Sequence, residues 1–406
     1  MQNKIYLACV GTRPEIIKMA PVYHEMRSRG HTMLLVHTGQ HESITDGLYA
    51  FFDMLPDITI YLKRQSSSLT HLTCALLESI DSAVEQLKPD VILVQGDTTS
   101  AFVGALIGCY HHKQVAHIEA GLRTHESEPF PEEKNREMIG RLSDWHFSPT
   151  EQAVMNLQNE GICSSRIFEV GNTVIDAAIW TNQRISAENF DFSLAAPPEL
   201  VLFIAHYSVR RLILVTAHRR ENWGQPIRDI AIAVGRLLLR HEDVVVVWPV
   251  HPNPAVRVSV EDEIRQLPTS VQERICLTEP LGYQALIAIL VRCEFALTDS
   301  GGIQEEASAF GKPVLITRKS TERQELVDAG GALLVGTDTD LILDKAELLL
   351  SDPLFYRQMQ LNESPFGDGH SARHIVDVLT QEISSVALLA GHLPSANVYS
   401  EGGISL

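Results

Sequence analysis

The feature that most constrains the fold is a regular alternation between short apolar segments and longer helical patterns. Four apolar segments in the first half of the chain have the length and composition of buried strands, at residues 5–10, 33–36, 91–94 and 115–118. Each is followed by a polar loop and then by a helical pattern. This order is typical of a parallel sheet that helices cover on both faces, so the sequence predicts an α/β fold.

The alternation restarts in the second half, after a polar stretch that contains prolines at about residues 181–210. Strands are predicted at 212–215 and 244–248, and helices at about 227–240 and 281–290. A chain of 406 residues exceeds the size at which one hydrophobic core keeps growing, so two domains are expected. Two α/β domains with a cleft between them are the simplest interpretation.

We expect the first domain to cover residues 1–180 and the second to cover residues 181–370. The final helical patterns, around 341–350 and 371–388, either complete the second domain or cross back over the first. For residues 371–406 we expect a helix that packs on the first domain, followed by a tail.

The segment TDSGGIQEE, residues 298–306, joins a predicted strand to a predicted helix through two glycines. Ser300, Gly301 and Gly302 would present backbone N–H groups at the positive end of the helix dipole, where an anion binds. Glu306, one turn into the helix, is within reach of sugar hydroxyls. Because a nucleotide carries both phosphate and sugar, we interpret the segment as a nucleotide-binding turn. A plain tight turn is the alternative.

The charge balance argues against one class of partner. The formal net charge is −18, and Lys and Arg form no clusters of the kind that nucleic acids require. Six scattered cysteines without a CxxC pair fit free, buried thiols in a reducing compartment. The N-terminal apolar run is too short for a signal peptide or a membrane span. We expect a soluble, cytoplasmic protein that binds neither nucleic acid nor membrane.

Few cations are placed to hold an anionic ligand. Arg13 and Lys18 lie at the start of the first predicted helix, a combination suited to a diphosphate. His218 follows another strand together with Arg219 and Arg220, and it adds a titratable donor. A solvated helix end or an ordinary surface arginine pair is the alternative for each group.

Acidic residues follow the strands of the first half. They are Asp97, Glu119 and the pair Glu132 and Glu133, the last two in a proline-flanked loop. Ligands of open parallel sheets bind at the carboxyl ends of the strands. Carboxylates that converge there suit proton transfer to and from carbon, or glycosidic cleavage. For Asp97, capping of the helix that follows is an equal alternative.

Signals for cofactors are weak. His111, His112 and His117 are spaced like metal ligands, but no Cys or carboxylate completes a ligand set, so no metal is expected. No G-x-G-x-x-G follows the first strand, so a dinucleotide cofactor is not supported. G-x-S-x-G and P-loop motifs are also missing from the sequence.

Several motifs resemble, in order, those of the non-hydrolysing UDP-N-acetylglucosamine 2-epimerases between about residues 5 and 375. They are GTRPEIIKMAPV (11–22), GDTTSA (96–101), HIEAGLRT (117–124), PFPEEKNR (129–136), GNTVIDA (171–177), TAHRREN (216–222), HPNP (251–254), TDSGGIQEEA (298–307) and GKPVLITRKSTER (311–323). The resemblance implies a glycosyltransferase-B-like fold of two Rossmann-like domains. It also implies interconversion of UDP-GlcNAc and UDP-ManNAc, no nicotinamide or metal, and a homodimer.

The motifs also carry residue roles. The resemblance implies that Asp97, Glu119, Glu132 and His218 are catalytic. It implies that the nucleotide is bound by Arg13, Lys18, Ser300, Gly301, Gly302, Glu306 and Arg323. Bacterial members also bind a second UDP-GlcNAc as an activator, near residues that Gln40, His41, Arg64 and Gln65 resemble.

Two positions depart from the family pattern. Gln324 stands where family members often carry a proline, and Leu286 stands where an aromatic residue can lie against uracil, although Tyr283 is close. The contact to the base is therefore left open.

The sequence supports a chemical hypothesis in which UDP leaves first, which acidifies the C2–H bond, and an acetamidoglucal intermediate forms. The assignment of base and acid among the carboxylates stays open. The alternatives are a hydrolysing epimerase that releases ManNAc and UDP, a glycosyltransferase of the same fold, and a non-catalytic sensor of the sugar nucleotide.

Overall fold

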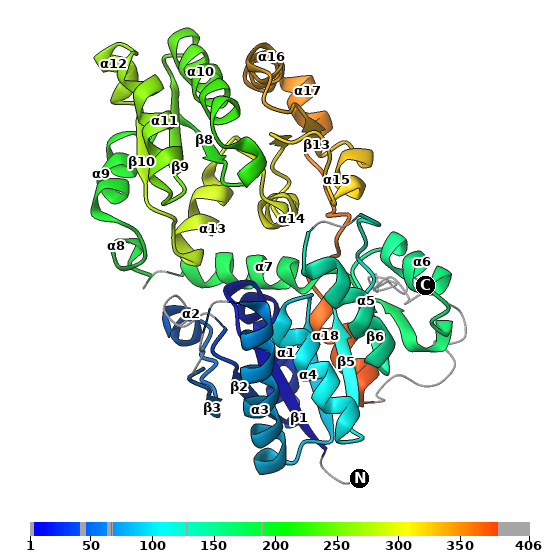
Figure 1. The fold of residues 1–406 in the computed structure, drawn as a ribbon. Coiled ribbons are helices and arrows are strands. Elements are labelled where there is room, and N and C mark those ends of the chain that lie inside the picture. The colour runs from blue at the N-terminus through cyan, green and yellow to red at the C-terminus, as the bar shows by residue number, and fades with distance from the viewer. Residues whose placement is uncertain are drawn as a thin grey trace, which may run out of the picture.

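A computed structural model describes residues 4–40, 46–62, 66, 68–126, 129–187 and 190–380. Two parallel sheets, each covered by helices, form the two halves of the molecule (Figure 1). The α/β prediction is therefore confirmed.

The first sheet has seven parallel strands in the order β3-β2-β1-β4-β5-β6-β7. The strands are β1 (Ile5–Val10), β2 (Thr32–His37), β3 (Ile58–Thr59), β4 (Val91–Gln95), β5 (Gln114–Ile118), β6 (Trp145–Ser148) and β7 (Ile167–Glu169). The helices of this half are α1 (Arg13–Ser28), α2 (Asp46–Phe51), α3 (Leu69–Leu87), α4 (Thr99–Tyr110), α5 (Glu132–Leu142), α6 (Glu151–Asn159) and α7 (Thr173–Ile185). A 3₁₀ turn, η1 (Ser164–Arg166), precedes β7.

The second sheet has six parallel strands in the order β10-β9-β8-β11-β12-β13. The strands are β8 (Arg211–Thr216), β9 (Val244–Pro249), β10 (Ile275–Thr278), β11 (Phe295–Thr298), β12 (Val314–Ile316) and β13 (Ala332–Leu334). The remaining helices are η2 (Arg220–Asn222), α8 (Phe192–Ala195), α9 (Pro198–His206), α10 (Gln225–Arg240), α11 (Pro254–Arg265), α12 (Thr269–Gln272), α13 (Tyr283–Arg292), α14 (Gly301–Ala309), α15 (Gln324–Asp328), α16 (Thr339–Ser351), α17 (Pro353–Met359) and α18 (Ser371–Thr380).

In both sheets the strand order reverses at a defined point, between β1 and β4 and between β8 and β11. The chain leaves these neighbouring strands in opposite directions, which opens a crevice beyond their carboxyl ends. Strands β1, β4, β8 and β11 are followed within three residues by Arg13, Asp97, His218 and Ser300, respectively. The topology therefore explains why residues from four separate motifs lie at the two crevices.

The predicted elements agree closely with the structure where the sequence has a long apolar run. Strand β1 matches its prediction, and the strands predicted at 33–36 and 212–215 extend by one residue at each end. The helix predicted at 371–388 is described as far as Thr380, and the rest lies outside the described residues. The expectation of buried thiols is wrong for Cys74, Cys109 and Cys163, which are exposed because they lie on outer helix faces or in loops.

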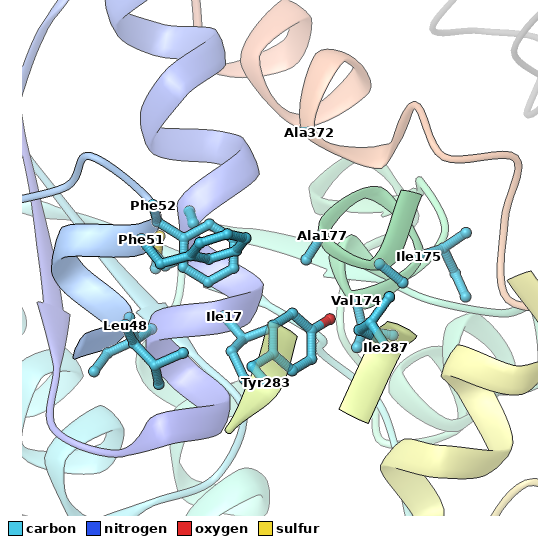
Figure 2. Close-up of a cluster of buried hydrophobic side chains, with 14 of the residues drawn as sticks. Ile17, Leu48, Phe51, Phe52, Val174, Ile175, Ala177, Tyr283, Ile287 and Ala372 are labelled. Atoms are coloured by element: carbon cyan, nitrogen blue, oxygen red, sulfur yellow. The ribbon is translucent and has the colours of Figure 1, made fainter. Parts of the chain in front are cut away.

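Helix α7 lies between the two sheets (Figure 1). It packs against α1 and α18 of one half and against α13 and α14 of the other. Figure 2 shows the side chains that meet there, with aromatic and aliphatic groups from both halves in one hydrophobic cluster. They include Ile17, Phe51, Phe52, Val174, Ala177, Tyr283 and Ile287.

The chain returns to the first half at its described end. Asp176 of α7 accepts hydrogen bonds from the backbone N–H groups of Ser371 (3.2 Å) and Ala372 (2.8 Å), and so caps α18. The approach is close, because a Cβ atom at Gly171 would lie 2.7 Å from Ser371 Oγ and 3.1 Å from Gly367 Cα. Gly171 also has a φ of +83°, which favours glycine.

The described helices include none with both the length and the apolar character needed to cross a lipid bilayer.

Candidate active site

Two adjoining cavities open at the crevices. The larger, of about 690 Å³, is lined by residues of both halves, among them Arg13, His218 and Ser300. The smaller, of about 370 Å³, is lined by residues of the first half. Pro14 and Lys18 line both cavities, so the two spaces meet at the first turns of α1.

The turn after β11 forms one wall of the larger cavity. Ser300 is the N-cap residue of α14, and Gly301 and Gly302 are its first two helical residues. All three line the cavity, so the positive end of the helix dipole faces it. At Gly301 a Cβ atom would lie 3.1 Å from the guanidinium carbon of Arg323. The glycine therefore makes room for an arginine as well as for an anion.

Arg13 joins the halves across this cavity. Its Nη2 donates a hydrogen bond to the carbonyl oxygen of Leu281 (3.1 Å), on the loop before α13. Burial lowers the pKa of Arg13, and the nearby carboxylate of Glu306 opposes that effect. A guanidinium with donors to spare at this point is suited to an anionic ligand.

Glu306 is a buried carboxyl in the second turn of α14. Burial, reinforced by the charge of Glu305, raises the pKa of Glu306 to about 8. Burial and the Glu306 carboxylate also raise the pKa of Tyr283 well above its ordinary value. Tyr283 and Leu286 both line the larger cavity, so an aromatic and an aliphatic side chain of α13 border the same space.

Glu119 lines the smaller cavity and is held by an ion pair and two side-chain hydrogen bonds. Lys18 Nζ forms an ion pair with it, and it accepts hydrogen bonds from Gln95 Nε2 (2.9 Å) and Asn172 Nδ2 (3.3 Å). Burial alone would raise the pKa of Glu119, but Lys18 and Arg323 lower it below its ordinary value. Its φ of +66° is unusual for a residue with a side chain, and such strain clusters at functional sites.

Asp97 lines the same cavity, and its role as a helix cap is contradicted. The N-cap of α4 is Thr98, whose side chain accepts from the N–H of Ala101 (3.0 Å). The Asp97 carboxylate instead pairs with Arg136, whose Nε lies 3.1 Å from Oδ2. Asp97 is thus available to a ligand and is held by a cation on α5.

The structure separates the two acids of the proline-flanked loop. Glu132 lines the smaller cavity. Glu133 is buried beneath it and accepts hydrogen bonds from the N–H groups of Thr124 (3.0 Å) and His125 (3.1 Å). Only Glu132 is therefore placed to meet a ligand in this cavity.

His218 lines the larger cavity with about half of its side chain exposed (48%). Its Nδ1 lies 3.0 Å from Oδ1 of Asp299, a fully buried carboxylate that follows β11. Arg219 lines the cavity beside it and pairs with Glu322 at 3.4 Å.

Lys18 and Arg323 both lie close to the buried carboxylate of Glu305. Lys18 Nζ lies 3.8 Å from Glu305 Oε2, and Arg323 Nε lies 2.8 Å from Glu305 Oε1. Burial lowers the pKa of Lys18, but Glu119 and Glu305 outweigh burial and raise it. Both cations therefore remain charged next to the cavities.

Some site residues were not singled out from the sequence. Gln95, Asn172, Arg136 and Asp299 contact predicted residues, and Glu15 lines the smaller cavity beside them. Four of the five lie within motifs that carry the resemblance. Glu15 accepts from the Gly11 N–H (3.0 Å) and from Thr98 Oγ1 (2.7 Å), and burial raises its pKa to about 7. Motif membership was the available signal, but it does not reveal which partner each residue takes.

Gln40 is the described member of the predicted activator group. It lines the smaller cavity, and its Oε1 accepts from the N–H (3.1 Å) and Oγ (2.7 Å) of Ser100. His41, Arg64 and Gln65 lie outside the described residues.

Two of the three histidines that are spaced like metal ligands have other partners. His111 Nε2 lies 2.6 Å from Asp81, and His117 Nε2 lies 2.8 Å from the Gly96 carbonyl oxygen. Burial lowers the pKa of His117 to about 3. Across the described ranges, no group of three or more His, Cys, Asp or Glu side chains is arranged to hold a metal ion.

Comparison with known proteins gives a consistent result. The family model described as UDP-N-acetylglucosamine 2-epimerase matches residues 24–380. A UDP-N-acetylglucosamine 2-epimerase of Yersinia pestis is 39% identical over 379 residues, which are 92% of this chain and 97% of that protein.

Solved structures indicate the same family. The UDP-GlcNAc 2-epimerase of Neisseria meningitidis bound to UDP-GlcNAc has a TM-score of 0.82 and 36% identity, over 93% of this chain and 99% of that one. The enzyme of Methanocaldococcus jannaschii in complex with UDP-GlcNAc and UDP has a TM-score of 0.75 and 30% identity, over 93% and 99%. The two-sheet architecture is glycosyltransferase-B-like, and the chain belongs to the UDP-N-acetylglucosamine 2-epimerase family.

Proposed function

We propose that the protein reversibly epimerises UDP-GlcNAc at C2 to UDP-ManNAc without net hydrolysis. One observation carries the proposal: a cavity lined by a helix N-terminus and cations adjoins a second cavity lined by Asp97, Glu119 and Glu132. The first suits a nucleoside diphosphate and the second suits proton transfer at a sugar carbon.

UDP would lie in the larger cavity. Its diphosphate would meet the N–H groups of Ser300, Gly301 and Gly302, together with Arg13 and His218, and Arg323 would hold a phosphate or the loop beside it. Glu306 would accept hydrogen bonds from the ribose hydroxyls. Tyr283 and Leu286 would border the uracil. The sugar would then extend past Lys18 toward the three carboxylates.

The order of bond breaking follows from the chemistry of the sugar. The C2–H bond is not acidic, because no carbonyl group lies next to that carbon. When the bond from C1 to the UDP oxygen breaks, C1 becomes cationic and the neighbouring C2–H becomes acidic. Stabilisation of the departing diphosphate by Arg13, His218 and the α14 amides is therefore the step that makes deprotonation feasible.

Loss of the C2 proton gives 2-acetamidoglucal. UDP then adds back to C1 while a proton is delivered to the opposite face of C2, which yields the epimer. Two groups on opposite faces are needed, so at least two of Asp97, Glu119 and Glu132 take part. Lys18 pairs with Glu119, which favours the ionised form of that carboxyl, and Arg136 pairs with Asp97.

The test is incubation with UDP-GlcNAc in D₂O, followed by proton NMR. We expect deuterium at C2 of both sugar nucleotides, with slow release of free UDP and glucal. Glu119→Gln and Glu132→Gln should lower kcat by several orders of magnitude with a modest change in KM. Glu137→Gln is the matched control, because Glu137 lies on the same helix as Glu132 and pairs with Lys134 (2.9 Å) at the surface.

The outcomes separate the alternatives. Retention of the C2 hydrogen in the product would exclude the mechanism. Accumulation of free ManNAc with UDP would indicate the hydrolysing reaction, and sugar transfer to an acceptor would indicate a glycosyltransferase. Binding of UDP-GlcNAc without turnover would indicate a sensor.

We also propose a cytoplasmic homodimer and a second UDP-GlcNAc, bound near Gln40, as an activator. The proposed domains remain 1–180 and 181–370, and for 371–406 we propose a helix that packs on the first domain, followed by a tail. The proposed boundary at residue 180 falls within α7.

A further inference from the structure

Asp299 is a buried carboxylate that the mechanism above does not use. It follows β11, which pairs with β8, so it lies beside the loop that carries His218. Its side chain is fully buried. An ionised group that is fully buried needs hydrogen-bond or ion-pair partners that offset the free-energy cost of its desolvation.

The two oxygens of Asp299 have different partners. Oδ2 accepts hydrogen bonds from the backbone N–H groups of His218 (2.8 Å) and Arg219 (2.9 Å) and from Asn222 Nδ2 (2.9 Å). Oδ1 lies 3.0 Å from His218 Nδ1, within ion-pair distance, and it forms no hydrogen bond in the described part of the chain. Oδ2 therefore stabilises the turn at His218 and Arg219, while Oδ1 faces the His218 imidazole.

The contact determines which ring nitrogen of His218 faces the cavity. With Nδ1 facing a carboxylate, the proton on Nδ1 is retained, and Nε2 lies on the opposite edge of the ring. His218 lines the larger cavity, so that edge is the part of the ring that a ligand can reach. If Nε2 is to donate a hydrogen bond to a phosphate oxygen, the ring must be an imidazolium, which the carboxylate stabilises.

We propose that Asp299 is a positioning residue that orients His218 and stabilises its imidazolium opposite the leaving diphosphate. The inference rests on the proposed function, because it gives His218 a phosphate to bind. Burial alone would raise the pKa of Asp299, but the nearby His218 and the hydrogen bonds from the Arg219 N–H and from Asn222 lower it, so the carboxylate is ionised next to the ring.

A purely structural role is the competing account, because Oδ2 also anchors the turn. Asp299→Asn separates the two. The amide oxygen can still accept from the backbone N–H groups of His218 and Arg219, whereas the amide nitrogen would face Nδ1. A donor there requires Nδ1 to be unprotonated, so the ring becomes neutral with its proton on Nε2.

The decisive experiment is a double-mutant cycle on UDP-GlcNAc epimerisation with Asp299→Asn and His218→Ala. We expect Asp299→Asn to lower kcat about tenfold in the otherwise unchanged protein, with little change in KM, because the neutral ring keeps its Nε2–H donor but loses its charge. In the His218→Ala background it should lower kcat less than about threefold, because its effect passes through the missing imidazole. The same factor in both backgrounds would overturn the proposal.

Asp176→Asn is the matched control. Asp176 is also a buried carboxylate that accepts from two backbone N–H groups, but it caps α18. We expect its effect on kcat to be the same with and without His218.

A second measurement uses the unmodified protein, so it does not depend on whether a variant folds. In protein labelled with ¹⁵N-histidine, the His218 ring should show a protonated Nδ1, and both nitrogens should be protonated when UDP is bound. A His218 ring with an unprotonated Nδ1 and a protonated Nε2 would overturn the proposal. If the protein fails to exchange the C2 hydrogen, the proposed function fails, whereas the NMR result still tests the contact between Asp299 and His218.

Discussion

At the scale of single residues, the protonation of Glu306 makes the stability of the fold depend on pH. Its folded pKa is about 8, above the ordinary value of 4.5. Between these pH values the folded protein holds a proton that the unfolded chain has lost. The stability associated with Glu306 is therefore fully present below about 4.5 and is lost as the pH rises toward 8.

Glu306→Gln should remove this dependence. We expect Tm to rise by about 2 °C or more at pH 8 and to change little at pH 5. Under the proposed binding mode, in which Glu306 accepts from the ribose hydroxyls, UDP affinity should fall about tenfold at pH 8, because an amide oxygen replaces the carboxylate. Thermal unfolding and titration calorimetry at the two pH values check both expectations.

Glu322→Gln is the control of opposite sign. Hydrogen bonding to Arg318 and the charge of Arg219 overcome burial and lower the pKa of Glu322 to about 2, so it stabilises the fold above pH 4.5. The variant should therefore lower Tm at pH 7. A fall in Tm for Glu306→Gln at pH 8 would contradict the assignment of a buried, protonated carboxyl.

The sequence identified the chemical types of the site residues but not their pairings. Asp97 fitted capping and catalysis equally well, and the structure excludes capping because Thr98 occupies the N-cap, while the catalytic role stays a prediction. The pair between Lys18 and Glu119 spans about a hundred positions of the chain, so no local pattern reports it. Asp299 was overlooked for the same reason, because its partner His218 belongs to another strand.

At the scale of elements, the close crossing at Gly171 should be sensitive to one added carbon. Gly171→Ala would place Cβ 2.7 Å from Ser371 Oγ, with φ at +83°. Gly161→Ala is the matched control, since Gly161 has a φ of +81° with nothing within 4 Å of the added carbon. We expect the control to cost about 1–2 kcal/mol of unfolding free energy.

Gly171→Ala should cost about 1–3 kcal/mol more than the control, because the crossing of α7 and α18 must also shift. Urea denaturation of the two variants measures the difference. Equal losses would mean that only the backbone conformation matters at this glycine.

Elements were predictable in proportion to their apolar length. Strand β1, with six residues, was located to the residue, whereas β3 has two residues and β6 contains Trp145 and His146. Short or mixed strands have too few apolar residues to show a period. They form because parallel neighbours satisfy their backbone groups, and a single chain segment does not reveal its neighbours.

At the scale of the molecule, the two sheets share one hydrophobic cluster. Phe52 stacks on Trp180 with ring centroids 5.2 Å apart and lies 6.0 Å from the ring of Tyr283. Tyr283 belongs to α13 of the second half. We expect the halves to unfold in one cooperative transition, which calorimetry measures.

Phe52→Ala should destabilise that single transition by about 3–5 kcal/mol. Ile342→Ala is the control, because Ile342 is buried in a cluster formed by the second half alone. Both variants should shift the same transition. Two separable transitions, with Ile342→Ala moving only one of them, would contradict cooperative unfolding. The repeat in the sequence indicated two α/β units, but it could not reveal this shared cluster, because periodicity reports each element separately.

The position of Lys18 on the wall between the cavities has a consequence for timing. Under the proposed mechanism its ammonium faces two anions, the diphosphate on one side and Glu119 on the other. Drawing the cation toward the freed diphosphate would leave Glu119 less neutralised and hence a stronger base. Movement of the Lys18 ammonium would thus couple the departure of UDP to the basicity of Glu119, so that the C2 proton is removed after UDP has left.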